Sequence, residues 1–220
     1  MVRHFFGLRF VPLGKELSVS QQIERLHQPH FHFNVILVGA DAFSTTEIKD
    51  VNRAVFDTRE IYSKAGVAVG RVKWFAIPVS SAGGHEDIAS DDEAVALTGS
   101  WTVHNNGLDV FVIRNGWFED GDERAGLSDQ GASCDKDADG SMSGSVVSVG
   151  GILTGSTMAH EMGHDFGLYH IVDLDKDELD EATEEQIRNL MFPFAVTTTG
   201  ELTLLQVVVI LQHCLIQPPC

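Results

Sequence analysis

One short stretch, HEMGHDFGLYH at residues 160–170, constrains this chain more than any other part of its sequence. On an α-helix, residues four apart lie about 40° apart around the axis, so His160 and His164 share one face. Gly167 permits the left-handed backbone conformation that ends a helix and reverses the chain. That reversal brings His170 back toward the other two histidines. The pattern therefore predicts a helix, a sharp turn and three converging imidazoles.

Three imidazoles that leave a fourth coordination position open are typical of catalytic zinc sites, whereas structural zinc sites are closed. Glu161 follows the first histidine directly, so its carboxylate can reach a metal-bound water without binding the metal. Zinc lowers the pKa of such a water to about 7, and a general base then takes its proton. We expect His160, His164 and His170 to bind Zn²⁺ and Glu161 to be the catalytic base. A chance match to HExxHxxGxxH has odds on the order of 1 in 10,000.

These residues resemble the motif of the metzincin clan of zinc endopeptidases. Residues 189–193 (NLMFP) resemble the clan's Met-turn, and a helix beginning near Thr203 resembles its C-terminal helix. The resemblance covers roughly residues 31–216 and implies a zinc-dependent endopeptidase that acts on protein or peptide substrates. It also implies that Gly167 and Met191 are structural, with Met191 as an apolar floor beneath the zinc.

The metzincin subfamily stays open. Pro193 stands where astacin- and serralysin-like members have a tyrosine, so no tyrosine ligand is expected. The residues GLYH at positions 167–170 resemble the corresponding part of the motif in the pappalysins. No cysteine precedes Cys134, so a matrixin-style cysteine switch is absent, although other features are matrixin-like.

The resemblance also implies where substrate binds. Residues 145–149 resemble the upper-rim strand of the clan, which pairs with the substrate backbone, and this assigns Val147 and Val149 to substrate binding. Phe192 and Pro193, which follow the Met-turn methionine, are expected in the wall of the S1′ pocket.

Hydrophobic periodicity predicts an α/β (α+β) domain, since strands and helices alternate along the chain. The fold that the resemblance implies is a metzincin-like catalytic domain. It has a twisted mixed sheet with an antiparallel edge strand, a backing helix, an active-site helix and a small C-terminal lobe. Strands are expected at residues 31–39, 66–77, 108–114 and 145–149, and helices from Ser44 or Thr45 to Gly66, at 91–97 and at 154–166.

The expected organisation is an N-terminal extension or pro-segment remnant at residues 1–30, followed by one catalytic domain. That domain, residues 31–220, divides into an N-terminal lobe (31–167) and a C-terminal lobe (168–220). Residues 115–144, rich in Gly and Asp, are expected to be irregular, and the strand at 145–149 to lie at the sheet edge.

The charge balance excludes one class of partner. The chain has 15 Lys and Arg against 32 Asp and Glu, a formal net charge of -17, whereas nucleic-acid-binding proteins carry basic surfaces. No apolar run reaches the roughly 18 residues that span a membrane. We expect a monomer that is secreted, although the N-terminus is a poor signal peptide. The expectation of secretion rests on the family resemblance and the acidic loops.

Two acidic runs are candidates for calcium. Asp135, Asp137 and Asp139, followed by Gly140, form the opening half of a calcium loop. The twelfth position is Val146, where an EF-hand needs glutamate, so a Ca²⁺ site completed by distant ligands and a solvated acidic loop both stay open. The run at residues 173–178 lacks the glycine and favours a charged helix start.

The chain contains Cys134, Cys214 and Cys220, which permit either one Cys134–Cys214 disulfide or three reduced thiols. Two alternatives to an active endopeptidase also stay open. One is a calcium-stabilised binding module or adhesin with a non-catalytic zinc site. The other is a latent proenzyme whose residues 1–29 block the active site.

Overall fold

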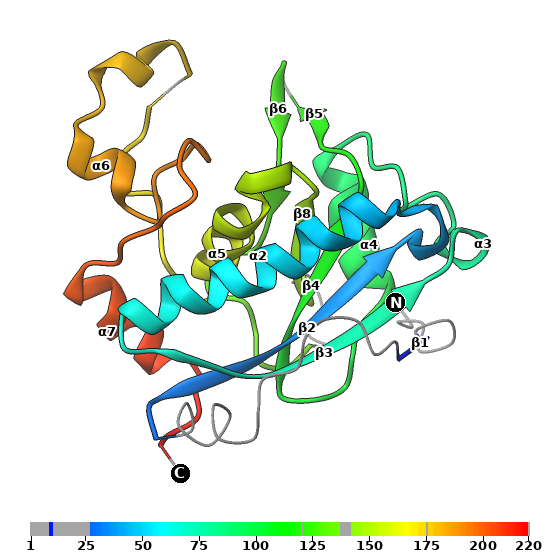
Figure 1. Cartoon of the computed structure of the whole chain (residues 1–220), viewed down its shortest axis with the longest axis horizontal. Helices are drawn as coiled ribbons and strands as arrows, with labels where there is room; N and C mark the ends of the chain where they lie inside the picture. The colour runs from blue at the N-terminus through cyan, green and yellow to red at the C-terminus, as the bar shows by residue number, and fades with distance from the viewer. Residues whose placement is uncertain (1–8, 11–26, 120, 137–141, 175, 220) are drawn as a thin grey trace.

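A computed structural model describes residues 9–10, 27–119, 121–136, 142–174 and 176–219. Its centre is a twisted six-stranded sheet of order β1-β3-β2-β4-β8-β7, with helices on both faces (Figure 1). The four inner strands run parallel, and the short strands at both edges run antiparallel to their neighbours. The strands of this sheet are β1 (Arg9–Phe10), β2 (His30–Val38), β3 (Ala68–Ile77), β4 (Gly107–Ile113), β7 (Gly126–Leu127) and β8 (Gly144–Ser148).

Side chains that alternate along the central strands enter two separate cores, as expected for strands covered on both faces. Phe33 and Val35 of β2 pack into the core beneath α2 (Thr45–Lys64) and α5 (Thr154–Asp165). Ile36 of the same strand packs on the opposite face, beside α4 (Asp91–Ser100). Every residue of β4 is buried, which confirms that it is a central strand.

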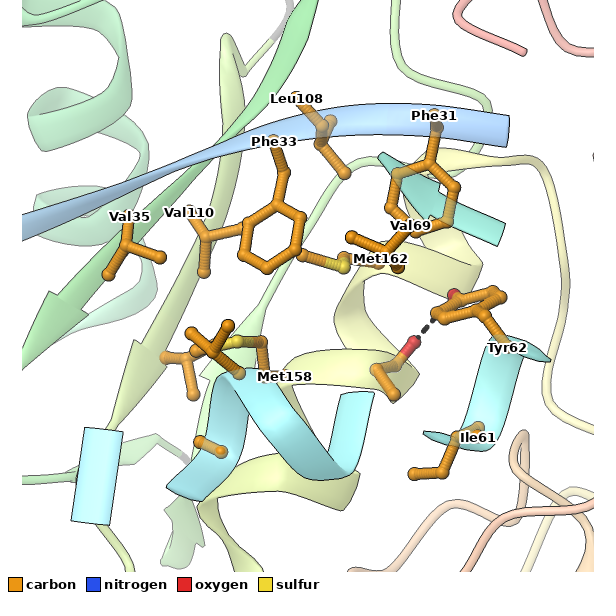
Figure 2. Packing of buried hydrophobic residues seen from close by; sticks show 14 of the residues in the cluster. Phe31, Phe33, Val35, Ile61, Tyr62, Val69, Leu108, Val110, Met158 and Met162 are labelled. Atoms are coloured by element: carbon orange, nitrogen blue, oxygen red, sulfur yellow. Dashed lines mark hydrogen bonds between the residues drawn. The ribbon is translucent and has the colours of Figure 1, made fainter. Parts of the chain in front are cut away.

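The first core joins the backing helix to the active-site helix (Figure 2). Tyr62 of α2 is fully buried and donates a hydrogen bond of 2.9 Å from its hydroxyl to the Ala159 carbonyl of α5. The Tyr62 and Phe31 rings meet edge to face at 5.1 Å, and Phe31 meets Phe166 at 4.9 Å. Met158 and the other buried apolar residues of α5 pack in this core against the sheet and α2. This packing fixes the position of α5.

The predicted start and end of the backing helix are confirmed. The Ser44 side chain accepts from the Glu47 N–H, and the Glu47 carboxylate accepts from the Ser44 N–H, which forms a capping box. Gly66, just beyond the helix, has a φ of 78°. The C-terminal helix α7 (Leu204–Gln212) begins with the same device at Thr203.

The Gly- and Asp-rich stretch contains strands that the sequence did not predict. A hairpin of β5 (Trp117–Glu119) and β6 (Asp122–Arg124) is followed by β7. Strands of two or three residues are too short to show an alternating pattern, which is why they were missed. β7 pairs antiparallel with β8 on its outer side, so the prediction that residues 145–149 form the sheet edge is wrong.

The Cys134–Cys214 disulfide is present, with a Cα–Cα distance of 6.3 Å, and joins the loop after β7 to the segment that follows α7. Cys220 lies outside the described residues. Within the described ranges, no helix has both the length and the apolar character needed to cross a membrane. The remaining helical elements are short: η1 (Ala40–Ala42), α3 (Val79–Ala82), η2 (Gly151–Leu153), η3 (Lys176–Glu181) and α6 (Glu184–Arg188).

Candidate active site

The active-site helix ends as the sequence predicts. Gly167 has a φ of 95°, and its N–H donates to the His164 carbonyl at 2.7 Å. The Leu168 N–H reaches back to the Gly163 carbonyl at 2.9 Å, so the last turn of α5 is closed by backbone hydrogen bonds. The chain reverses there, and His170 returns to the face of α5 that carries the first two histidines.

The three imidazoles meet at one point. The Nε2 atoms of His160, His164 and His170 lie 3.1 Å from one another. Nitrogens bound to a tetrahedral zinc at 2.0–2.1 Å are separated by about 3.3 Å, so the triangle has the size that this ion requires. The donor set and its spacing fit Zn²⁺.

Backbone carbonyls orient two of the histidines. The Nδ1 atoms of His160 and His164 lie 2.7 Å from the carbonyls of Leu190 and Leu168, respectively. Because a carbonyl only accepts, each Nδ1 carries the proton and each Nε2 keeps its lone pair for a metal. Burial, followed by the neighbouring histidines, lowers the pKa of His170 to about 4. The neutral, metal-binding form of the ring is therefore favoured.

The Met-turn supports the site from below. Met191 is fully buried, and a methyl group at Gly163 would lie 2.5 Å from its sulfur, so any larger residue there would displace the Met191 side chain. The Met191 N–H donates to the Asn189 side chain at 2.9 Å, and the Met191 carbonyl accepts from the Ile171 N–H at 3.1 Å. The turn thus holds the segment that follows His170.

Glu161 is buried beside the histidine triangle, with 7% of its surface exposed. The Ser128 hydroxyl donates to its Oε2 at 2.7 Å, and a methyl group at Gly126 would lie 2.6 Å from its Oε1. Burial raises the pKa of this carboxyl, while His164 and the Ser128 hydrogen bond act in the opposite direction. Sequence reasoning missed Gly126 and Ser128, because they lie far from the motif in a stretch without periodicity.

The triad opens into a cavity of about 470 Å³ with two distinct walls. The ligand wall consists of α5 and the Met-turn, residues 189–193, together with the segment that follows it. The strand wall consists of residues 122–128, which include β7. Phe192 and Pro193 line the ligand wall.

Two residues predicted to contact substrate, Val147 and Val149, lie outside the lining of this cavity. Val147 is fully buried in the first core, and Val149 is partly buried against that core, and neither lines the cavity. The physical reason is β7, which covers the outer side of β8: Gly126 pairs with Val147 and Leu127 with Val146. The edge that faces the cavity is therefore β7.

The calcium prediction is untested. Asp135 is exposed, and Asp137 and Asp139 lie outside the described residues. Within the described part of the chain, the two groups whose side chains are close enough to hold a metal are the histidine triad and Cys134–His213–Cys214. In the second group, the two sulfurs form the disulfide.

Comparisons with known proteins agree with this geometry. The sequence profile of the metallo-peptidase family M12B, reprolysin-like, matches residues 80–171, a segment that ends just after the third histidine. No curated protein sequence matches the chain significantly.

Two solved structures share the fold at low identity. Metalloproteinase-II from Bacteroides fragilis is 13% identical with a TM-score of 0.53; the match covers 92% of this chain but 56% of that one, so this chain spans little more than half of its length. Archaemetzincin from Methanopyrus kandleri is 13% identical with a TM-score of 0.50, over 83% of this chain and 95% of that one. Residues 80–171 are therefore similar to the reprolysin-like metallopeptidases, and the chain has the fold of the metzincin-like zinc metalloproteinases.

Proposed function

We propose that this protein is a zinc-dependent endopeptidase of metzincin type, with Glu161 as its general base. The observation that carries the proposal is the triangle of Nε2 atoms, 3.1 Å on each side, with the buried Glu161 carboxylate directly beside it. Three protein ligands leave one position open, as in catalytic zinc sites. His160, His164 and His170 would hold the ion.

Held by these three histidines, zinc would act as a Lewis acid, lowering the pKa of a coordinated water to about 7 and polarising the scissile carbonyl. Glu161 accepts the proton of the attacking water on its carboxylate and later delivers it to the nitrogen of the leaving amine. Nothing else in the cavity wall is needed as a base, because Glu161 is adjacent to the first ligand in α5.

The strand wall suits an extended peptide. β7 is the last strand of the sheet, with β8 on its inner side, and it lines the cavity. An extended chain can add to such an edge through main-chain hydrogen bonds, while pockets select its side chains. We propose that β7 aligns the substrate backbone and that the segment including Phe192 and Pro193 forms the pocket beyond the scissile bond. Secretion and calcium binding stay predictions.

The test compares wild type with Glu161→Gln on a complex peptide mixture read by mass spectrometry, with zinc content measured in both. The glutamine amide oxygen can still accept from Ser128 but cannot take a proton from water at neutral pH. We expect internal peptide bonds to be cleaved by the wild type alone, with equal zinc in both proteins. Zinc-loaded wild type that cleaves nothing would sink the proposal and favour a non-catalytic zinc protein.

A further inference from the structure

The loop that follows β7 crosses the C-terminal end of the active-site helix and is fastened there. The Gly131 N–H donates to the His164 carbonyl at 2.9 Å, and the Ala132 N–H donates to the Asp165 carbonyl at 3.0 Å. These carbonyls belong to the last turn of α5, and the His164 carbonyl also accepts from the Gly167 N–H. The loop is therefore placed relative to the helix that carries the metal ligands.

The same loop is anchored at its far end. Cys134 is joined by the disulfide to Cys214, at the end of α7. The His213 Nε2 lies 3.1 Å from the Ala132 carbonyl, which adds a second link to the same place. With β7 paired to β8 at the start of the loop, Ser128 lies on a segment that is held on both sides.

Ser128 and Gly126 enclose the Glu161 carboxylate between them. In extended backbone, residues two apart point to the same face, and here that face is turned to Glu161. The Ser128 hydroxyl donates to Oε2 at 2.7 Å, while Gly126 lies against Oε1 and Cγ, where a methyl group would come within 2.6 Å. The carboxylate is thus fixed from two sides by one short segment.

We propose that Ser128 is a positioning residue for the general base: its hydrogen bond sets the orientation of the Glu161 carboxylate, and Gly126 leaves the room for it. The inference rests on the proposed function. The terminal torsion of a glutamate side chain has a broad, shallow energy profile, so burial alone does not fix the plane of the carboxylate. A hydrogen bond to one oxygen fixes that plane and leaves the other oxygen for the proton of the attacking water. The transfer of a proton from the attacking water to Glu161 depends on alignment of the two groups at the level of an ångström.

The experiment uses the full chain loaded with zinc and compares Ser128→Ala, Ser128→Thr and the control Ser133→Ala. Ser133 is exposed on the same loop, and its hydroxyl accepts a hydrogen bond from the Asp135 N–H. We expect Ser128→Ala to lower kcat about 10- to 100-fold with KM and zinc content unchanged. Ser128→Thr, which keeps the hydroxyl, should restore most of kcat, and Ser133→Ala should match the wild type.

Gly126→Ala provides an independent test, because its methyl group displaces the same carboxylate without removing the serine. We expect a loss of kcat of the same order, again with zinc retained. A readout without turnover is the affinity for acetohydroxamate, a zinc chelator whose hydroxyl can donate to Glu161. Its Kd should rise about tenfold in both Ser128→Ala and Gly126→Ala.

The two proposals fail in different ways. If the wild type cleaves no peptide, the proposed function fails, and acetohydroxamate affinity still tests the role of Ser128. If Ser128→Ala equals the wild type in both kcat and acetohydroxamate affinity, the positioning role is overturned. It is also overturned if Ser128→Ala loses zinc, since the serine then supports the metal site as a whole rather than the base.

Discussion

The ligand wall of the cavity is a buried helix resting on an apolar turn, whereas the strand wall is a two-residue edge strand followed by a polar loop. In the ligand wall, Met158, Met162 and Met191 are fully buried and hold α5 from within the core. In the strand wall, the residues of β6 are exposed, and those of β7 are half-buried. Backbone hydrogen bonds and a disulfide replace the missing core there.

This difference assigns separate tasks to the two walls. The metal ligands depend on helical spacing and on close packing, which tolerate little displacement. The carboxylate of Glu161 depends on Ser128 and Gly126, which only the assembled sheet brings to it. Changes to the histidine ligands and to the residues packed beneath them should therefore weaken zinc binding and turnover together, whereas changes to Glu161 or to the strand wall should reduce turnover while zinc stays bound.

The largest effect is expected from His164→Ala. Loss of one of three protein ligands leaves too few donors for a stable zinc site, so zinc and peptide cleavage should both fall below detection. Metal content after dialysis and cleavage of a fluorogenic peptide measure the two effects. His85→Ala, a histidine outside the cavity lining, is the control and should keep both.

Met191→Ala tests the floor of the ligand wall. Removing a fully buried methionine leaves a cavity beneath α5, and such substitutions cost about 2–5 kcal/mol of unfolding free energy. Urea unfolding followed by circular dichroism measures this loss, and a competition with a coloured chelator measures zinc affinity. Met191→Leu, which nearly conserves volume, is expected to lose less than half as much. Equal stability of Met191→Ala and wild type would contradict the supporting role.

Cys134→Ser tests the fastening of the strand wall. The disulfide closes a sequence separation of 80 residues, and its removal should lower the unfolding free energy by about 2–4 kcal/mol. We expect zinc to be retained and kcat to fall, because the loop that carries Ser128 loses its anchor. Cys214→Ser should have the same effect, and the double variant should add nothing to either. Additive losses would mean that the thiols act separately.

The smallest effect is a pH dependence that arises away from both walls. Burial lowers the pKa of His32 to about 4 from its ordinary 6.5, and its Nδ1 accepts from the Arg71 N–H at 2.9 Å. Below pH 6.5 the unfolded state therefore binds more protons at His32 than the folded state does. The free energy of unfolding thus decreases progressively as the pH falls from 6.5 toward 4. Urea midpoints of metal-free protein between pH 7 and 4 should decline in wild type, and less steeply in His32→Gln. An unchanged slope would exclude His32 as a contributor.

The parts of the fold with strong local signals were predictable. The alternation and apolar content of β2, β3 and β4 indicate central strands, and the Ser44 and Thr203 caps mark where helices begin. The histidine triad was also predictable, since its spacing is a property of one helix and one turn. The hairpin and β7 were not, because they are too short for any period to appear.

What the sequence determined by itself is the chemistry: helical spacing places two imidazoles on one face, and Gly167 allows the reversal that adds the third. What only the tertiary structure decided is which strand faces the cavity and what holds the base. Val147 packs in the first core, and β7 pairs on the outer side of β8, so β7 is the strand that faces the cavity. Ser128 reaches Glu161 through contacts between residues 33 positions apart, and contacts of that range follow from strand pairing and burial, which no local spacing encodes.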